Sequence, residues 1–413
     1  MNGSYLKSAG RLVPGRPGGG VGLPVASWPD KLWALGTGQG EDGMTYRTRW
    51  LGVSRTSPAP PGELLAPSEP PGEPARSPGP GRWMPGLNWR SRLGPVPVLG
   101  WLALVVAVVV VGLALFVTGP GGSPNRSGLP WASGVYPEDG TPAGAAAFAA
   151  WRGRPLDVVD AWSARATWAQ IDDPTWLYQR WRGQRYTMAF GVPMIPEGVP
   201  GVSLQACANG AYDAYWRQFG QVISSYGLGN SIIRLGWEFN GTWYAWKATD
   251  PTVWARCWQQ IVTAARATAP NLRWDWDVNR GVSGGLANPA LAYPGNAYVS
   301  MIGVDSYDSW PAATTTAGWQ TQLNGPQGLN YWLSFAKAHG KLLSVPEWGN
   351  VATGAGSGGD DPQYVTDMRD FFAANAADIA FECSFQGDQS TTGASYGAGT
   401  SIAKASAAYK AGF

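Results

Sequence analysis

The segment Arg234-Leu-Gly-Trp-Glu238-Phe-Asn240-Gly241-Thr-Trp243-Tyr-Ala-Trp246 follows directly on the short apolar run Ser231-Ile-Ile. It places a glutamate at the end of a β-branched run, just ahead of a turn of glycine and aromatic residues. Further along the chain, Ser344-Val-Pro-Glu347-Trp-Gly349 repeats this arrangement. Two carboxylates at the C-terminal tips of buried strands predict a parallel α/β fold in which both carboxyl groups meet at one edge.

On both sides of this segment, short apolar runs with strand character alternate with longer segments of helical periodicity. One such helix is expected to begin at Asp250-Pro251. The predicted strands are Trp131–Tyr136, Leu156–Trp162, Tyr186–Pro193, Ser231–Glu238, Arg273–Asn279, Tyr298–Tyr307, Leu342–Glu347 and Ile379–Phe385. This alternation predicts a (β/α)₈ TIM barrel over residues 131–413. The alternative, a doubly wound open sheet, would normally carry a Gly-rich turn after its first strand, and Val135-Tyr-Pro-Glu-Asp-Gly is not one.

In a barrel of this kind, functional groups lie at the C-terminal ends of the strands. Glu238 and Glu347 both fall there. So do Asp160, Asp277, Asn279, Asp305 and Tyr307. A pair of carboxyl groups at one edge fits glycoside hydrolysis, in which one group donates a proton and the other is ionised to attack or to activate water.

The N-terminal third has a different composition. Residues 1–95 are rich in Pro, Gly and Arg without periodicity, which predicts a disordered tail. Residues 96–118 form a long uncharged apolar run, which predicts one transmembrane helix, and 119–130 a short linker. Arg82, Arg90 and Arg92 precede the run and only Arg126 follows closely, so we expect a cytoplasmic N-terminus and an extracellular barrel at the cell membrane. A signal peptide is the alternative. Met84 begins a basic lead into this run, so residues 1–83 are expected to be dispensable or a result of start-site choice.

Composition excludes several other classes of function. The only histidine is His339, which argues against a Ser-His-Asp triad, a Cys-His dyad and a histidine-rich zinc site. No cofactor and no metal site is expected. Residues 131–413 carry a slight excess of acidic side chains, which argues against a nucleic-acid partner. The three cysteines, Cys207, Cys257 and Cys383, allow one disulfide, but the sequence does not choose the pair.

The motifs resemble those of glycoside hydrolase family 26. The strand-four motif of that family reads Arg, two residues, His, Glu, one residue, Asn-Gly, and the segment Arg234–Gly241 is similar except that Trp237 replaces the histidine. Glu347-Trp-Gly349 resembles the nucleophile motif, and Gly303-Val-Asp305-Ser-Tyr307 resembles the strand-six motif. The likeness spans Trp131 to the C-terminus. It implies a retaining enzyme on a (β/α)₈ barrel that cuts β-mannans, mixed-linkage β-glucans or β-1,3-xylans.

The resemblance also implies roles for individual residues. Glu238 would be the proton donor and later the general base, and Glu347 the nucleophile. Tyr307 would donate a hydrogen bond to Glu347, and Arg234 would keep Glu347 ionised. The remaining expected substrate-binding or supporting residues are Trp237, Asn240, Trp243, Trp246 and Trp348. Asp305 is expected to be structural, bonding the backbone of its own loop.

The 24 tryptophans divide into two expected groups. Trp254, Trp258, Trp319 and Trp332 lie at helical spacing and should face the core, while Trp274 and Trp276 should lie in the barrel wall or interior. Trp243, Trp246, Trp310 and Trp348 lie in predicted strand-end loops, where exposed aromatic faces could bind sugars. Because Trp237 departs from the family motif, two alternative functions remain: a catalytically weakened carbohydrate-binding or wall-tethering barrel, and a transglycosylase.

Overall fold

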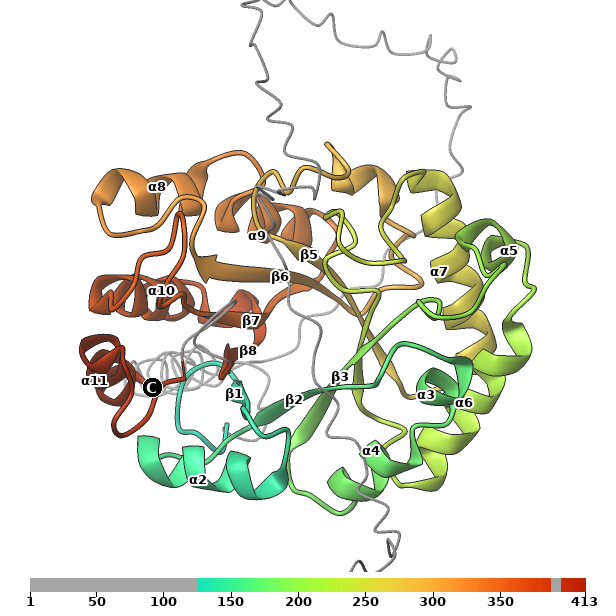
Figure 1. Ribbon diagram of the computed structural model, residues 1–413, viewed down its shortest axis with the longest axis horizontal. Coiled ribbons are helices and arrows are strands. Elements are labelled where there is room, and N and C mark those ends of the chain that lie inside the picture. The colour runs from blue at the N-terminus through green and yellow to red at the C-terminus, as the bar shows by residue number, and fades with distance from the viewer. Residues whose placement is uncertain (1–124, 388–394) are drawn as a thin grey trace, which may run out of the picture. The chain divides into compact units, whose positions relative to one another are not determined.

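Parallel pairing runs in sequence order from β1 to β8, and β8 pairs back with β1 to close a barrel. The computed structural model describes residues 125–387 and 395–413, and Figure 1 shows the helices arranged around these strands. The strands are β1 (Ser133–Tyr136), β2 (Val158–Trp162), β3 (Thr187–Val192), β4 (Ile232–Leu235), β5 (Arg273–Asn279), β6 (Met301–Asp308), β7 (Leu342–Asn350) and β8 (Ile379–Phe385). The (β/α)₈ barrel predicted for this part of the chain is therefore confirmed.

The helices of the described residues follow the strands in alternation. They are α2 (Pro142–Arg152), α3 (Trp168–Asp172), α4 (Thr175–Trp181), α5 (Leu204–Ala208), α6 (Asp213–Ser225), α7 (Pro251–Arg266), α8 (Thr316–Asn324), α9 (Leu329–Ala338), α10 (Pro362–Ala374) and α11 (Ala403–Gly412), with the short 3₁₀ helices η1 (Pro289–Ala292) and η2 (Ala376–Asp378). Helix α7 begins as predicted: Pro251 is its first residue, and the Asp250 carboxylate accepts from the backbone N–H groups of Thr252 and Val253.

Two strand ends differ from the prediction in a way that affects the functional residues. Strand β4 ends at Leu235, so Glu238 lies in the turn beyond it and not on the strand. Strand β7 continues to Asn350, so Glu347 lies within the strand and not at its tip. The expectation that both glutamates end their strands is therefore wrong in detail, although both lie toward the C-terminal end of the barrel.

Large aromatic side chains fill the layer between barrel and helices. Trp254, Trp258, Trp319 and Trp332 are buried there, as predicted. On β5, Trp276 packs against Phe335 of α9 at a ring-centroid distance of 5.7 Å. Since successive side chains of a strand alternate in direction, the intervening aspartates of β5 point into the barrel.

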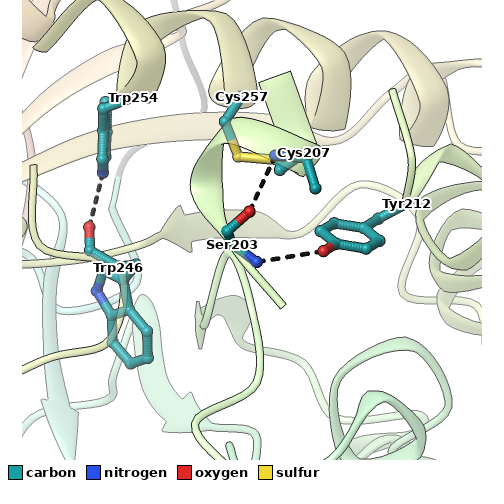
Figure 2. The surroundings of a disulfide bond; sticks show 7 residues. Ser203, Cys207, Tyr212, Trp246, Trp254 and Cys257 are labelled. Atoms are coloured by element: carbon teal, nitrogen blue, oxygen red, sulfur yellow. Dashed lines mark hydrogen bonds between the residues drawn. A yellow bond between two sulfur atoms is a disulfide. The ribbon is translucent and has the colours of Figure 1, made fainter. Parts of the chain in front are cut away.

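A disulfide fastens α5 to α7 (Figure 2). It joins Cys207 to Cys257 across 50 residues of sequence, a loop that includes β4 and the turn with Glu238. One turn before Cys257, the Trp254 indole N–H donates to the backbone oxygen of Trp246 at 2.9 Å. The same helix therefore carries the disulfide and supports the loop after β4. Cys383, the third cysteine, is free and buried.

The predicted disordered tail, residues 1–95, and the predicted transmembrane helix, residues 96–118, lie outside the described residues. Within residues 125–387 and 395–413, no helix combines the length and the apolar character needed to span a bilayer. The last residues of the predicted linker, 125–130, are described and lie at the N-terminal end of the barrel. There the Arg126 guanidinium donates to the backbone oxygens of Leu156 and Arg185.

Candidate active site

The polar centre of the barrel follows from the two-residue period of the strands. Val158 and Ile232 belong to a small apolar cluster that draws on five strands, which is possible only inside the barrel. Two residues further along, Asp160 on β2 and Arg234 on β4 point to the same side as Val158 and Ile232. A charged layer therefore lies above the apolar layer, nearer to the C-terminal end of the barrel, and Asp305 of β6 joins it.

Arg234 is the centre of this charged layer and is fully buried. Its Nη1 donates to Asp160 at 2.6 Å, and its Nε and Nη2 both donate to Asp277 Oδ2, at 2.8 and 2.6 Å. Its Nη2 also lies 2.8 Å from Asp305 Oδ2 and 2.9 Å from Glu347 Oε1. The expectation that Asp305 bonds the backbone of its own loop is wrong: its carboxylate pairs with Arg234 from another strand.

One guanidinium thus faces four carboxyl groups in the buried interior, and they cannot all be ionised at low cost. Burial raises the pKa of Asp160 and of Asp305 well above the ordinary range, despite the attraction of Arg234. Burial also raises the pKa of Asp277 to about 7. Burial by itself lowers the pKa of Arg234, but the surrounding carboxylates, Asp160 most strongly, raise it well above its ordinary range, so the cation persists. The layer therefore combines a persistent positive charge with carboxyl groups whose pKa values are raised by burial.

Glu347 is held at the edge of this layer by two donors of different kinds. Arg234 donates to Oε1 at 2.9 Å, and the Tyr307 hydroxyl donates to Oε2 at 2.6 Å. Burial, and next the nearby Glu347 charge, raise the pKa of Tyr307 well above its ordinary range, so the phenol keeps its proton and remains a donor. The two contacts predicted for Arg234 and Tyr307 are both present. An ion pair and a phenol donor in this geometry stabilise a charged carboxylate and fix its orientation.

Glu238 lies in a turn with an unusual backbone. Its φ of 52° is in the left-handed region, which non-glycine residues seldom adopt. Two backbone contacts hold this conformation: Glu238 N–H donates to the Asp277 oxygen at 3.1 Å, and Gly241 N–H donates to the Glu238 oxygen at 3.0 Å. Because such strain persists only where the surroundings impose it, the direction of the Glu238 side chain is fixed by its neighbours on β5 and in the turn.

The Glu238 carboxyl group accepts hydrogen bonds from two neutral side chains. The Asn279 amide donates to Oε1 at 2.7 Å and the Trp243 indole N–H donates to Oε2 at 3.0 Å. Asn240 fixes Asn279 by two bonds to its backbone, one donated to Asn279 O and one accepted from Asn279 N, each 2.8 Å long. Asn240 therefore acts through Asn279. The sequence marks Asn279 only as a polar strand end, and the structure adds it to the site.

Two of the aromatic residues expected to bind substrate lie elsewhere. Trp246 is fully buried, stacked on Tyr244 at 4.4 Å, and its indole donates to the backbone oxygen of Trp237. Trp237 is also buried, and its indole donates to the Tyr244 hydroxyl at 3.0 Å. The expected exposed face of Trp246 is therefore absent, and the Trp237 side chain belongs to a packed aromatic cluster under the turn. Trp243, by contrast, is half-buried and contacts Glu238.

Trp348, next to the predicted nucleophile, is likewise not an exposed aromatic. It is fully buried, packs on Phe413 at 5.0 Å and donates through its indole to Glu382 Oε2 at 2.6 Å. The alternation along β7 explains this: Glu347 points into the barrel, so Trp348 points outward to the helix layer. The expectation of a sugar-binding face at Trp348 is wrong.

Two features around the site matter for its chemistry: whether a metal-binding cluster is present, and where a hollow lies. Within the described ranges, no group of three or more His, Cys, Asp or Glu side chains is arranged to hold a metal ion. A hollow lined by Arg185, Asn230 and Arg273 opens at the N-terminal ends of β3 to β5. It lies at the opposite end of the barrel from Glu238 and Glu347, so it is separate from the candidate active site.

Sequence comparisons support the resemblance. Residues 230–345 match the profile of glycosyl hydrolase family 26, a range that contains β4 to the middle of β7. An endoglucanase H of Acetivibrio thermocellus is 28% identical over 168 residues, 38% of this chain and 18% of that protein. A mannan endo-1,4-β-mannosidase of Bifidobacterium adolescentis is 23% identical over 158 residues, 36% of this chain and 16% of the relative. The chain thus spans less than a fifth of the length of either relative.

Solved structures support the fold. A modular endo-β-1,4-mannanase from Cellulomonas fimi superposes with a TM-score of 0.50 at 17% identity, over 64% of this chain and 65% of that one. A protein designated GH26C from a Muricauda species superposes with a TM-score of 0.51 at 17% identity, over 70% of this chain and 85% of that one. At this level of identity the superpositions establish the shared barrel.

Proposed function

From its relation to glycoside hydrolase family 26, we propose that this chain is a retaining β-glycoside hydrolase acting on a β-linked polysaccharide. The observation that carries the proposal is the contrast between two buried glutamates at one end of the barrel. Glu347 is paired with a buried cation and a phenol, whereas Glu238 is contacted by an amide and an indole. Environments that differ in this way assign the ionised role to one carboxyl group and the proton-donating role to the other.

In the proposed mechanism, the Glu347 carboxylate attacks the anomeric carbon while Glu238 donates its proton to the leaving glycosidic oxygen. The glycosidic bond breaks and an ester forms between the sugar and Glu347. Glu238, now ionised, removes a proton from water, whose oxygen attacks the anomeric carbon and releases Glu347. Two displacements at one carbon give a product with the configuration of the substrate.

The supporting residues would act through these two glutamates. Arg234 and Tyr307 would hold Glu347 in line for attack, since each contacts one of its two carboxylate oxygens. Asn279 would hold the Glu238 carboxyl group toward the bond that is cleaved, with Asn240 fixing Asn279 in turn. Preorganised donors of this kind lower the reorganisation needed to reach the transition state.

For the substrate we propose a β-mannan, a mixed-linkage β-glucan or an envelope glycan with β-linkages. The name of one relative, a mannan endo-1,4-β-mannosidase, supports a β-1,4-linked mannan, and the name of the other, an endoglucanase, supports a glucan. The alternative of a binding protein without turnover rested on the replacement of the family histidine by Trp237. Because the Trp237 indole is turned into the aromatic cluster, that replacement leaves the contacts of both glutamates intact.

We further propose that residues 96–118 anchor the chain in the cell membrane, with the N-terminus in the cytoplasm and the barrel outside. The Cys207–Cys257 disulfide supports an oxidising compartment for the barrel. Protease added to intact cells should digest the barrel; full protection in intact cells, with digestion only after lysis, would contradict this orientation.

The test of the activity uses the full chain in detergent, with mannan, glucomannan, lichenan and β-1,3-xylan as substrates. Glu238→Gln serves as the matched control, because it keeps the shape of the side chain and removes its acidity. Reducing ends released by the wild type and not by Glu238→Gln would establish the activity and identify the substrate class. Correctly folded wild-type protein that releases none from any of the four would contradict the proposal for these glycans.

A further inference from the structure

Trp310 is the most exposed aromatic side chain among the described residues, with 66% of its surface accessible. It follows β6 directly, three residues after Tyr307, which contacts Glu347. Exposed aromatic residues are common singly and carry no meaning by themselves. The feature that sets Trp310 apart is the way in which its loop is fixed.

The loop after β6 is tied to the loop after β7 by backbone contacts. Trp310 N–H donates to the Gly356 oxygen at 3.3 Å, and Gly358 N–H donates to the Asp308 oxygen at 2.9 Å. Between these contacts, Ser309 and Ser357 form an antiparallel bridge. The loop that presents Trp310 is therefore paired with the loop that follows the strand of Glu347.

The Asp308 side chain fixes the same loop from inside. Its Oδ1 accepts from Ala313 N–H at 2.7 Å, and its Oδ2 accepts from the Asn350 amide at 3.3 Å. Both Asp308 and Asn350 are fully buried. The backbone on either side of Trp310 is thus anchored to the C-terminal ends of both strands.

The indole itself rests on Gly356. A β-carbon added at Gly356 would lie 2.9 Å from Cδ2 and Cε2 of the Trp310 ring, closer than real contacts allow, so only glycine fits beneath the ring. Trp310 also has a φ of 49°, a left-handed conformation that costs energy for a bulky residue and persists only when its surroundings impose it. One side of the indole is therefore covered by backbone, and the rest of a large apolar surface is held out to solvent at a conformational cost.

We propose that Trp310 forms a sugar-binding subsite on the rim between β6 and β7, where a pyranose ring of the bound β-glycan stacks on the exposed indole. The axial C–H groups of a β-linked pyranose form a flat apolar face that matches an aromatic ring. Three residues of extended chain span at most about 10 Å, so the subsite belongs to the same glycan chain that reaches Glu347. This inference rests on the proposed function and adds a subsite beyond the two sugar units joined by the cleaved bond.

The test compares substrates of different length. Trp310→Ala should raise KM for the polysaccharide by roughly 3- to 10-fold, because a stacking contact of this kind contributes on that scale. It should leave kcat unchanged, and it should leave both constants unchanged for the shortest oligosaccharide that the wild type cleaves. Trp310→Phe, which keeps a flat ring, should recover most of the affinity.

Trp176→Ala provides the matched control. Trp176 is 47% exposed on α4 in the outer helix layer, and it is expected to behave as wild type on every substrate. An equal rise of KM for the polysaccharide in both alanine variants would show that exposed tryptophans bind the glycan nonspecifically, and this result would overturn the proposed subsite. A loss of kcat on the shortest substrate in Trp310→Ala would show a purely structural role for the loop, and unchanged KM on the polymer would also overturn the proposal.

A binding measurement separates this inference from the proposed activity. The Glu238→Gln variant should migrate more slowly through a gel that contains the polysaccharide. Adding Trp310→Ala should weaken this retardation, which corresponds to a loss of about 3- to 10-fold in apparent affinity. If the wild type releases no reducing ends but this difference persists, the subsite stands and the activity fails. If the wild type is active and the difference is absent, the activity stands and the subsite fails.

Discussion

The β4–β5 edge and the β6–β7 edge of the barrel each hold one buried glutamate, but they hold it in different ways. At the β6–β7 edge, Glu347 meets a guanidinium and a phenol at the border of a charged layer. At the β4–β5 edge, Glu238 lies on a strained turn and meets an amide and an indole. In the proposed mechanism, this difference prepares one glutamate for attack and the other for proton donation.

The largest expected effect comes from removing the side chain at the β6–β7 edge. Glu347→Ala should lower kcat by more than roughly 10⁴-fold on every substrate, because no group remains to form the covalent intermediate. Added azide should restore turnover of an activated glycoside and give a glycosyl azide of inverted configuration, measured by NMR. A variant that cleaves natural and activated substrates with its normal retained stereochemistry would remove Glu347 from the nucleophile role.

The second largest loss of activity is expected for Glu238→Ala, and its size should depend on the leaving group of the substrate. Glu238→Ala should lower kcat/KM on polysaccharide by roughly 10²- to 10⁴-fold, the usual contribution of general acid catalysis. Formation of the covalent intermediate from a substrate with an activated leaving group should be nearly unchanged, since such a group needs little proton donation. The measurement is the pre-steady-state release of the leaving group. Equal losses on activated and natural substrates would break the distinction between the two edges.

A third, smaller effect tests the donors around Glu347. Tyr307→Phe removes one hydrogen bond to a charged carboxylate, which is worth roughly 1.5–3 kcal/mol, or about 10- to 100-fold in kcat. The loss should appear equally with activated and natural substrates, because the phenol acts on the nucleophile. Asn279→Ala is the paired variant at the other edge, and its loss should be confined to natural substrates. If both variants lost activity equally on activated and natural substrates, the proposed difference between the two glutamates would be contradicted.

The smallest effect on activity is expected at the charged layer beneath Glu347. Burial raises the pKa of Asp160 well above its ordinary range, so protonation of its carboxyl group is favoured more in the folded protein than in the unfolded chain. Asp160→Asn imitates the protonated form and keeps an acceptor for Arg234, so kcat should stay within about threefold of wild type, as for a nearly neutral substitution. A loss of more than tenfold would show that Asp160 must be ionised.

The same variant also tests how the stability of the folded protein changes with pH. A buried acid with a raised pKa binds more protons in the folded than in the unfolded state, so its contribution to stability falls as pH rises above about 4, the ordinary value for Asp. Replacing Asp160 with Asn removes this loss. Denaturant unfolding at pH 4 and pH 7 measures how much the free energy of unfolding falls between the two pH values. This fall should be smaller for Asp160→Asn than for wild type. A larger fall would contradict a raised pKa for Asp160.

The sequence was sufficient for the fold because the strand signal is local. All eight predicted strands are present, and the bounds of β5 and β8 agree with the prediction, since polar or turn residues flank each apolar run. The strand positions depend on the order and period of residues along the chain, which the sequence displays directly. The contacts of Arg234 and Tyr307 with Glu347 were expected from the resemblance to glycoside hydrolase family 26.

The errors arose where tertiary packing decides whether a side chain is buried. Trp246 and Trp310 both lie in loops that follow strands, yet Trp246 is buried and Trp310 is exposed; Trp348, which lies within β7, is also buried. The difference lies in Trp254 of α7, which bonds the Trp246 backbone, and in Phe413 and Glu382, which cover Trp348. The aspartates around Arg234 could not be assigned for the same reason, because their partner lies on another strand.

The central claim is that Glu347, and not Glu238, becomes covalently linked to the sugar. The direct test is to incubate the protein with a 2-deoxy-2-fluoro glycoside of the sugar class identified by the activity assay, digest the protein and locate the label by mass spectrometry. We predict one labelled peptide, with the sugar on Glu347. A label on Glu238, or turnover that leaves no label and yields a product of inverted configuration, would contradict the account.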